Sequence, residues 1–240
     1  MVDNFKLIRD YIEKKIIGSG TWKEGDCFYV QLLRRQADDP LIDGKKDKKY
    51  HGNMHSRSIK DYLIKSLQHL DDVEEDIKML CKEFNVRAYI RLNKRNYKNI
   101  NLEMMKHIAE QCASGETYSS PYHLVSSACG QTCQAGKNKT WIVDCDAEHK
   151  DIIEEIMKII SQCQPNNKTI SNLMEQLNVN ENVAYNIWKD ENIFTVPTKN
   201  GTHLIVQPFN KKMFKDIWYK TKNVRVPDIH QDNPTILFAP

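Results

Sequence analysis

The chain has 240 residues, and at about 150 residues per domain this length allows one large domain or two closely packed ones. Hydrophobic residues make up 40% of the chain and charged residues 28%, with 9 glycines and 8 prolines, which excludes collagen-like, disordered and disulfide-rich classes. The formal net charge of +3 is too small for binding nucleic acid through overall charge. Any such contact therefore has to come from local clusters of basic residues.

The seven cysteines are scattered and odd in number, and the first ten residues lack the basic and apolar segments of a signal peptide. This pattern predicts reduced thiols in a cytoplasmic protein. No apolar run approaches the roughly 18 to 20 residues that span a bilayer, and the mean hydropathy is -0.63. The sequence therefore predicts no contact with the membrane interior.

In the N-terminal part, residues 1–84, apolar periodicity alternates between helical and extended spacing. It predicts helices over 1–17 and 70–84 and strands over 27–33 and 59–64. The intervening segment 40–57 is polar and rich in lysine, which is typical of a surface loop. This part is expected to be an α/β portion that supports the fold.

In the remaining part, residues 85–240, the same reasoning predicts strands over 86–92, 140–143, 194–196, 202–206 and 235–238. It also predicts helices over 102–112, 151–160 and 212–219, and one or two helices over 170–188. Segment 119–136 consists of small residues and shows little periodicity. No clear linker interrupts the chain. We therefore expect an α/β (α+β) protein, built as a single unit over 1–240, in which a mixed β-sheet is flanked by helices.

The apolar strand predicted at 140–143 runs into Asp144 and Asp146. Side chains two residues apart in a strand point to the same side, so both carboxylates would lie together at the strand end. Like charges so close repel each other unless a cation or a hydrogen-bond network compensates, which suggests a site for a divalent cation. The alternative is that Asp144 caps the helix near Lys150 while Asp146 is solvated.

A second group of polar residues lies in the predicted hairpin around the Asn-Gly turn. The turn carries Lys199 and Gly201, and His203 follows at the start of the next strand. Glycine would allow a ligand to approach the backbone, histidine can bind a metal or a phosphate, and lysine adds a point charge. A packed structural histidine is the alternative.

A third group begins at Asp228, which follows a short apolar pair and is trailed by His230 and Asp232. Either aspartate could complete a metal site. The alternative is an aspartate-rich turn, which Asn233 and Pro234 would continue.

Taken in order, these groups resemble the archaeo-eukaryotic primase superfamily, which includes the primase-polymerases. The pattern there is an apolar strand ending in Asp-x-Asp, then a strand with Gly-x-His, then a third aspartate. Here the positions are Asp144 and Asp146, Gly201 and His203, and Asp228, and the resemblance covers about residues 86–238. An arginine that many members carry after the third aspartate is replaced by the segment 233–235, Asn-Pro-Thr.

The resemblance implies nucleotidyl transfer by a two-metal mechanism with Mg²⁺ or Mn²⁺. Asp144, Asp146 and Asp228 would be the catalytic metal ligands. His203 would contact the triphosphate of the incoming nucleotide, with Gly201 beside it and Lys199 as a nearby charge that comes from our own interpretation of the residues.

The predicted strand at 86–92 displays Arg87, Tyr89 and Arg91 on one face and continues into a basic segment with Lys94 and Arg95. The two arginines are further candidates for binding nucleotide phosphates. Basic residues interleaved with tyrosines suit stacking on unpaired bases, so Tyr89, Lys94 and Arg95 are candidates for binding nucleic acid. A solvated strand followed by a basic loop is the alternative.

Cys129 and Cys133 form a pair with three intervening residues, and His123, Cys112 or Cys145 could add ligands for zinc. The spacing is not that of a standard zinc knuckle and no second close pair exists. Buried or loop thiols are therefore preferred to zinc.

We therefore expect a primase- or polymerase-like nucleotidyltransferase of DNA replication that uses a single-stranded DNA or RNA template and nucleoside triphosphates. A replication helicase or accessory protein could act in trans, and a stand-alone, phage-like protein is an option. Two alternatives stay open: a non-catalytic nucleic-acid or nucleotide-binding protein with the same fold, and a metal-dependent nuclease that uses the same carboxylates with water.

Overall fold

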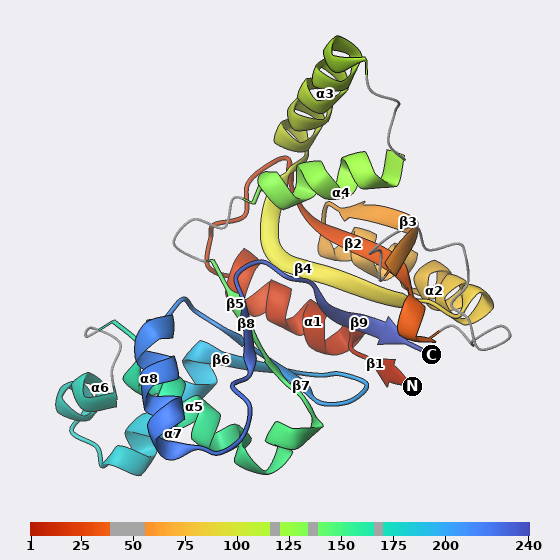
Figure 1. The fold of residues 1–240 in the computed structure, drawn as a ribbon. Coiled ribbons are helices and arrows are strands. Elements are labelled where there is room, and N and C mark those ends of the chain that lie inside the picture. Colours follow the sequence, from red (N-terminus) through yellow and green to blue (C-terminus); the bar gives the residue numbers. More distant parts are fainter. Residues whose placement is uncertain (39–55, 116–120, 134–138, 166–169) are drawn as a thin grey trace, which may run out of the picture. The chain divides into compact units, whose positions relative to one another are not determined.

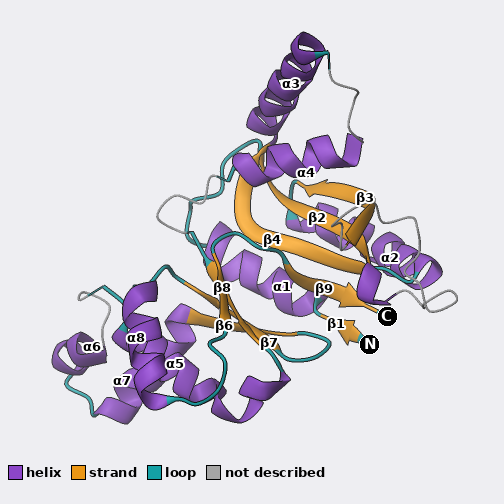
Figure 2. Cartoon of the chain, in the orientation of Figure 1, coloured by secondary structure: helices purple, strands orange, loops and turns teal. Residues whose placement is uncertain are grey.

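The computed structural model describes residues 1–38, 56–115, 121–133, 139–165 and 170–240 (Figures 1 and 2). Contacts within the chain divide it into two compact units. Unit 1 comprises residues 1–137 and 234–240, and unit 2 comprises residues 138–233. The division expected at residue 84 is not the one observed, because strand β4 (Arg87–Asn96) pairs with strand β2 (Asp26–Arg35) and completes a sheet begun in the N-terminal part.

Unit 1 contains a five-stranded antiparallel sheet with the strand order β1-β9-β4-β2-β3. The remaining strands are β1 (Val2–Asp3), β3 (Ser56–Ile64) and β9 (Thr235–Ala239). Strand β9 comes from the C-terminal end of the chain and lies between β1 and β4 (Figure 1). Both central strands are largely buried, although only β2 has a near-continuous apolar sequence.

Helices lie against both faces of this sheet. The helices of unit 1 are α1 (Phe5–Tyr11), which continues as the π-helical segment η1 (Ile12–Ile17), α2 (Leu67–Phe84), α3 (Tyr97–Ser114) and α4 (Pro121–Gln131), with a short 3₁₀ segment η2 (Gln36–Asp38) after β2. Tyr29 packs with Ile100 of α3 and Ala128 of α4, while the next residue of the strand, Phe28, faces η1 and α2. Alternation along β2 therefore provides an apolar surface for each layer of helices.

Unit 2 contains a four-stranded antiparallel sheet with the strand order β6-β7-β5-β8. Its strands are β5 (Trp141–Cys145), β6 (Ile193–Pro197), β7 (Thr202–Val206) and β8 (Asp228–His230), and its helical segments are η4 (Ala147–Ile152), α5 (Ile153–Gln162), α6 (Ile170–Leu177), α7 (Glu181–Asn192) and α8 (Lys211–Thr221). Val143 and Leu204 face a core that includes Trp188 of α7 and Trp218 of α8. This core holds the helices on one face of the sheet (Figure 2).

The predicted α+β class is confirmed. The expected mixed sheet is wrong, because the strands form two sheets in which every described pair is antiparallel. Helix α4 lies within the segment 119–136, where no periodic element was expected, and the short strands β1 and β8 were also not expected. Most of the predicted loop 40–57 lies outside the described residues. Among the helices that the structure describes, none combines the length and apolar character needed to cross a bilayer.

Candidate functional site

Strand β5 brings three of the predicted site residues together in unit 2. It lies between β7 and β8, and Asp144 is paired in register with His203 on one side and with Asp228 on the other. Residues directly opposite each other in antiparallel strands share one face of the sheet, with Cβ atoms about 4.5 to 5.5 Å apart. Side chains spread over 85 positions of the sequence thus form one row across three strands.

The central pair of this row is in direct contact. The Nε2 atom of His203 lies 3.3 Å from an Oδ1 atom of Asp144, and the two side chains are 14% and 35% exposed. Burial favours the neutral form of Asp144, but the hydrogen bond and charge of His203, together with the rings of His230 and His149, outweigh it and lower the pKa of Asp144 below 3.8. Asp144 is therefore held as a carboxylate.

The alternation along β5 explains why Asp144 is on this face. Val143 and Cys145 are buried in the core beneath the helices, so the residue between them points to the opposite face. Asp144 lies within the strand and does not cap a helix. Asp146 occupies the N-cap position of η4, makes no side-chain capping hydrogen bond and is exposed. The Asp146 carboxylate is thus open to solvent, whereas that of Asp144 is partly exposed and contacts His203.

Asp228 completes the row from the opposite edge. Its Oδ2 atom lies 3.0 Å from Nη2 of Arg225, and the two side chains are 57% and 64% exposed. Ion pairs that are this exposed contribute only about 0 to 1 kcal/mol. The Asp228 carboxylate can therefore exchange Arg225 for another cation at little cost.

These residues fit a divalent cation by chemistry and by register. Carboxylate oxygens are the ligands that Mg²⁺ and Mn²⁺ prefer, and Asp144 and Asp228 project from adjacent strands of one sheet face. Within the described ranges, no three His, Cys, Asp or Glu side chains are already gathered around a common point. Binding would therefore require the exposed carboxylates to turn toward the ion, which Asp228 can do by leaving Arg225.

Gly201 has a structural role that differs from the expected one. A Cβ atom at this position would lie 2.0 Å from the carbonyl oxygen of Cys145 and 3.0 Å from Cα of Asp146. In the direction of an added side chain, Gly201 thus meets the end of β5, and its backbone also lines a cavity. The turn is closed by Thr198, whose hydroxyl accepts a 3.0 Å hydrogen bond from the Gly201 amide.

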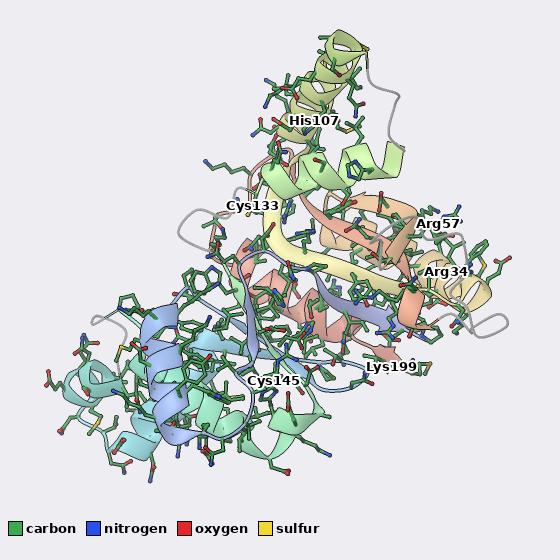
Figure 3. All side chains as sticks on the ribbon, in the orientation of Figure 1. Arg34, Arg57, His107, Cys133, Cys145 and Lys199 are labelled. Carbon is green, nitrogen blue, oxygen red and sulfur yellow. The ribbon has the colours of Figure 1, made fainter. Side chains whose placement is uncertain are left out.

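A cavity of about 320 Å³ adjoins the end of β5. It is lined by the β6–β7 turn on one side and by η4 and α5 on the other, with Lys199, Lys150 and Asp146 as its charged members. Figure 3 labels Lys199 on this turn and Cys145 at the end of β5. Two lysines beside an aspartate can bind a ligand that carries phosphate groups and a bridging cation.

The arginines and the tyrosine predicted at the start of β4 belong to unit 1. Arg87 forms an ion pair with Asp38, and Tyr89 is only 9% exposed. Arg91 is half-buried. Strand β4 is flanked by β2 and β9 and covered on both faces, so its side chains are less accessible than alternation alone suggests.

Lys94 and Arg95 are also committed to the interior of unit 1. Lys94 donates hydrogen bonds to the carboxylate of Asp26, which is 4% exposed as a side chain, and to the Thr21 carbonyl. Arg95 is completely buried, with Nε 2.8 Å from the carbonyl oxygen of Cys129. The prediction that Arg95 contacts nucleic acid at the surface is therefore wrong, because its buried guanidinium donates hydrogen bonds to carbonyl groups of the protein.

The cysteine pair considered for zinc also lies in unit 1. Cys129 is buried, where burial raises the pKa of its thiol to about 12. Cys133 is half-buried and forms a backbone bridge with Arg95.

The structure places one further residue beside the row, which the sequence indicated only as a neighbour of Asp228. His230 pairs in register with Ile142 and lies two residues from Asp228, on the Asp144 face of β8. In the sequence, only the alternation Asp228-Ile229-His230 indicates that His230 shares a face with Asp228. Three residues are too few for such alternation to predict a strand.

The chain was compared with protein-family models, with curated proteins and with solved structures, and none of the three comparisons finds a match.

Proposed function

We propose that the chain is a metal-dependent nucleotidyltransferase of the primase-polymerase type. The observation that carries the proposal is the register of unit 2, in which Asp144 pairs directly with both His203 and Asp228. The sequence motifs required these residues to be neighbours, although 59 and 84 positions separate His203 and Asp228 from Asp144 along the chain. A chance set of polar residues has no reason to occupy opposite positions on three adjacent strands.

Each residue has a role that its surroundings support. Asp144 and Asp228, with Asp146 at the strand end, would hold the divalent cations, and His203 keeps the Asp144 carboxylate in place through its 3.3 Å contact. Divalent cations would activate the attacking hydroxyl and stabilise the charge of the departing pyrophosphate. Lys199 and Lys150 line the adjoining cavity and would bind the phosphates of the incoming nucleotide.

The proposal is tested by primer-extension and de novo synthesis assays on single-stranded DNA and RNA, with labelled NTPs and dNTPs and with Mg²⁺ and Mn²⁺ in turn. The informative variants are Asp144→Asn and Asp228→Asn. Asp190→Asn on α7 is the matched control, because Asp190 is an exposed aspartate of the same unit outside the row. We expect product from the wild type and from Asp190→Asn only.

Three outcomes would contradict the proposal. Synthesis by Asp144→Asn at the wild-type rate would show that the Asp144 carboxylate is not needed for the reaction. Metal-dependent shortening of the oligonucleotide, with no dependence on nucleotides, would assign the same carboxylates to hydrolysis. A wild type that binds the oligonucleotide without changing it would favour a non-catalytic binding protein.

A further inference from the structure

A second cavity of unit 2, which the sequence motifs do not include, lies between α8 and the segment that leads into β8. It has a volume of about 380 Å³. Three of its lining residues, Lys211, Lys215 and Tyr219, follow each other at intervals of four and therefore share one face of α8. The opposite wall includes Arg225 and Asp228. We refer to this cavity as the α8 groove.

Positive charge is concentrated around the α8 groove. Its charged lining residues are three basic ones, Lys211, Lys215 and Arg225, and one acidic one, Asp228, which gives the groove a formal charge of +2. The complete chain carries +3. This is the kind of local cluster that a polyanion needs when overall charge is small.

The cations of the groove are positioned by contacts within the protein. Lys211 lies over the ring of Trp141, with Nζ 4.6 Å from its centroid, and donates a 3.2 Å hydrogen bond to the Ile229 carbonyl. Burial and the nearby charge of Lys215 lower the pKa of Lys211. An anion in the groove would relieve this repulsion, because it would attract both lysines.

Tyr219 gives the groove an aromatic surface. The residue is 71% exposed, although the next residue before it in the helix, Trp218, is completely buried. The buried tryptophan donates a 2.8 Å hydrogen bond to the Val224 carbonyl and fixes this turn of α8 against the chain that follows. Tyr219 is thus an exposed ring on a rigid support, which suits stacking on an unpaired base.

We propose that the α8 groove binds single-stranded nucleic acid, with backbone phosphates at Lys211, Lys215 and Arg225 and a base stacked on Tyr219. A groove of this volume accommodates about one nucleotide unit, not the width of a duplex. Because Asp228 belongs both to the groove wall and to the row with Asp144, the strand would pass beside the proposed metal site. This deepens the proposed function but does not depend on turnover.

The groove is tested by fluorescence anisotropy with a labelled oligothymidylate of about 15 nucleotides. The buffer contains EDTA and no nucleotide, so the result is independent of catalysis and of metal binding. Tyr219→Ala should weaken binding about 5- to 150-fold, the effect of losing one stacked base, whereas Tyr219→Phe keeps the ring and should stay within about twofold of the wild type.

The charge of the groove is tested with two double variants that remove the same number of cations. Lys215→Ala/Arg225→Ala changes the groove, and Lys212→Ala/Lys220→Ala removes two exposed lysines of α8 that lie on other faces of the helix. For single strands, each lost phosphate contact reduces the slope of log K against log salt by about 0.7. The groove variant should therefore lose about 1.4 from the slope, and the control less than half as much.

Equal losses of slope in the two double variants would overturn the proposal, because they would show that the oligonucleotide is attracted by the charge of α8 as a whole and not by the groove. So would equal affinity for a duplex of the same length, or equally effective competition by polyglutamate. A wild type that binds the oligonucleotide as described but makes no product in the synthesis assay would support the groove and contradict the proposed transfer reaction.

Discussion

The packing of Gly201 against the end of β5 allows a sharp prediction for the substitution Gly201→Ala. The new methyl carbon would lie 2.0 Å from the carbonyl oxygen of Cys145 and 3.0 Å from Cα of Asp146, which are backbone atoms at the end of β5 and directly after it. The backbone at Gly201 does not have the positive φ that favours glycine, so the whole effect is steric. Either the β6–β7 turn or the end of β5 has to move.

The magnitude follows from the cost of overpacking, which is about 1 to 3 kcal/mol for an added methylene group. Since backbone atoms cannot rotate away, we expect the upper half of that range, about 2 to 3 kcal/mol. For a chain of this size, 1 kcal/mol lowers the midpoint of thermal unfolding by about 2 to 4 °C. Gly201→Ala should therefore lower the midpoint by about 4 to 12 °C.

Circular dichroism during thermal and urea unfolding measures this change. Gly130→Ala is the matched control, because a Cβ atom at Gly130 in helix α4 meets nothing within 4 Å. That substitution should stabilise the protein by about 0.5 to 1 kcal/mol, since alanine is preferred to glycine in helices. If Gly201→Ala were as stable as the wild type, the close packing of the β6–β7 turn against the end of β5 would be refuted.

Three further predictions concern unit 1. The hydrogen bonds of Tyr62 and Lys60 lower the pKa of Asp76 below 3.8. The Asp76 carboxylate therefore stabilises the fold above about pH 4, and this contribution is lost as the pH falls further. In urea titrations, the difference in stability between the wild type and Asp76→Asn should shrink below pH 4. Arg95→Met should cost about 2 to 4 kcal/mol in the same titrations, because it leaves buried carbonyl groups without their donor. A maleimide at neutral pH should label exposed Cys112 first, as peptide mapping would show, and faster labelling of a buried cysteine would contradict the described burial.

Much of the fold follows from local patterns in the sequence. The strand that precedes Asp144 is predicted by its apolar residues, and the β6–β7 hairpin is predicted by its Asn-Gly turn. Helix α4 was missed because its small residues define no apolar stripe, so its position depends on contacts with Tyr29 and Ile100 that are distant in sequence.

The site was predictable in composition but not in geometry. Sequence order indicated Asp144, His203 and Asp228, yet their register depends on β5 lying between β7 and β8, which is a property of the whole sheet. The assignment of Arg95 failed for a related reason. Alternation identifies two faces of a strand, but it cannot show that a central strand such as β4 is covered on both of them.

Arg225 connects the metal site with the α8 groove, and its removal should change the two in opposite directions. Its ion pair with Asp228 competes with a divalent cation for the same carboxylate, and an exposed pair contributes up to about 1 kcal/mol. Arg225→Ala should therefore raise Mn²⁺ affinity, by up to about fivefold, in calorimetric titrations.

The same substitution should weaken binding of the oligothymidylate, because a phosphate loses its partner in the groove. Asp228→Asn is the informative comparison, since it removes a metal ligand and also a negative charge beside the strand. It should reduce Mn²⁺ binding and strengthen oligonucleotide binding, the reverse of Arg225→Ala in both assays. If either substitution shifted both affinities in the same direction, Asp228 could not be the point at which the metal site and the strand site meet.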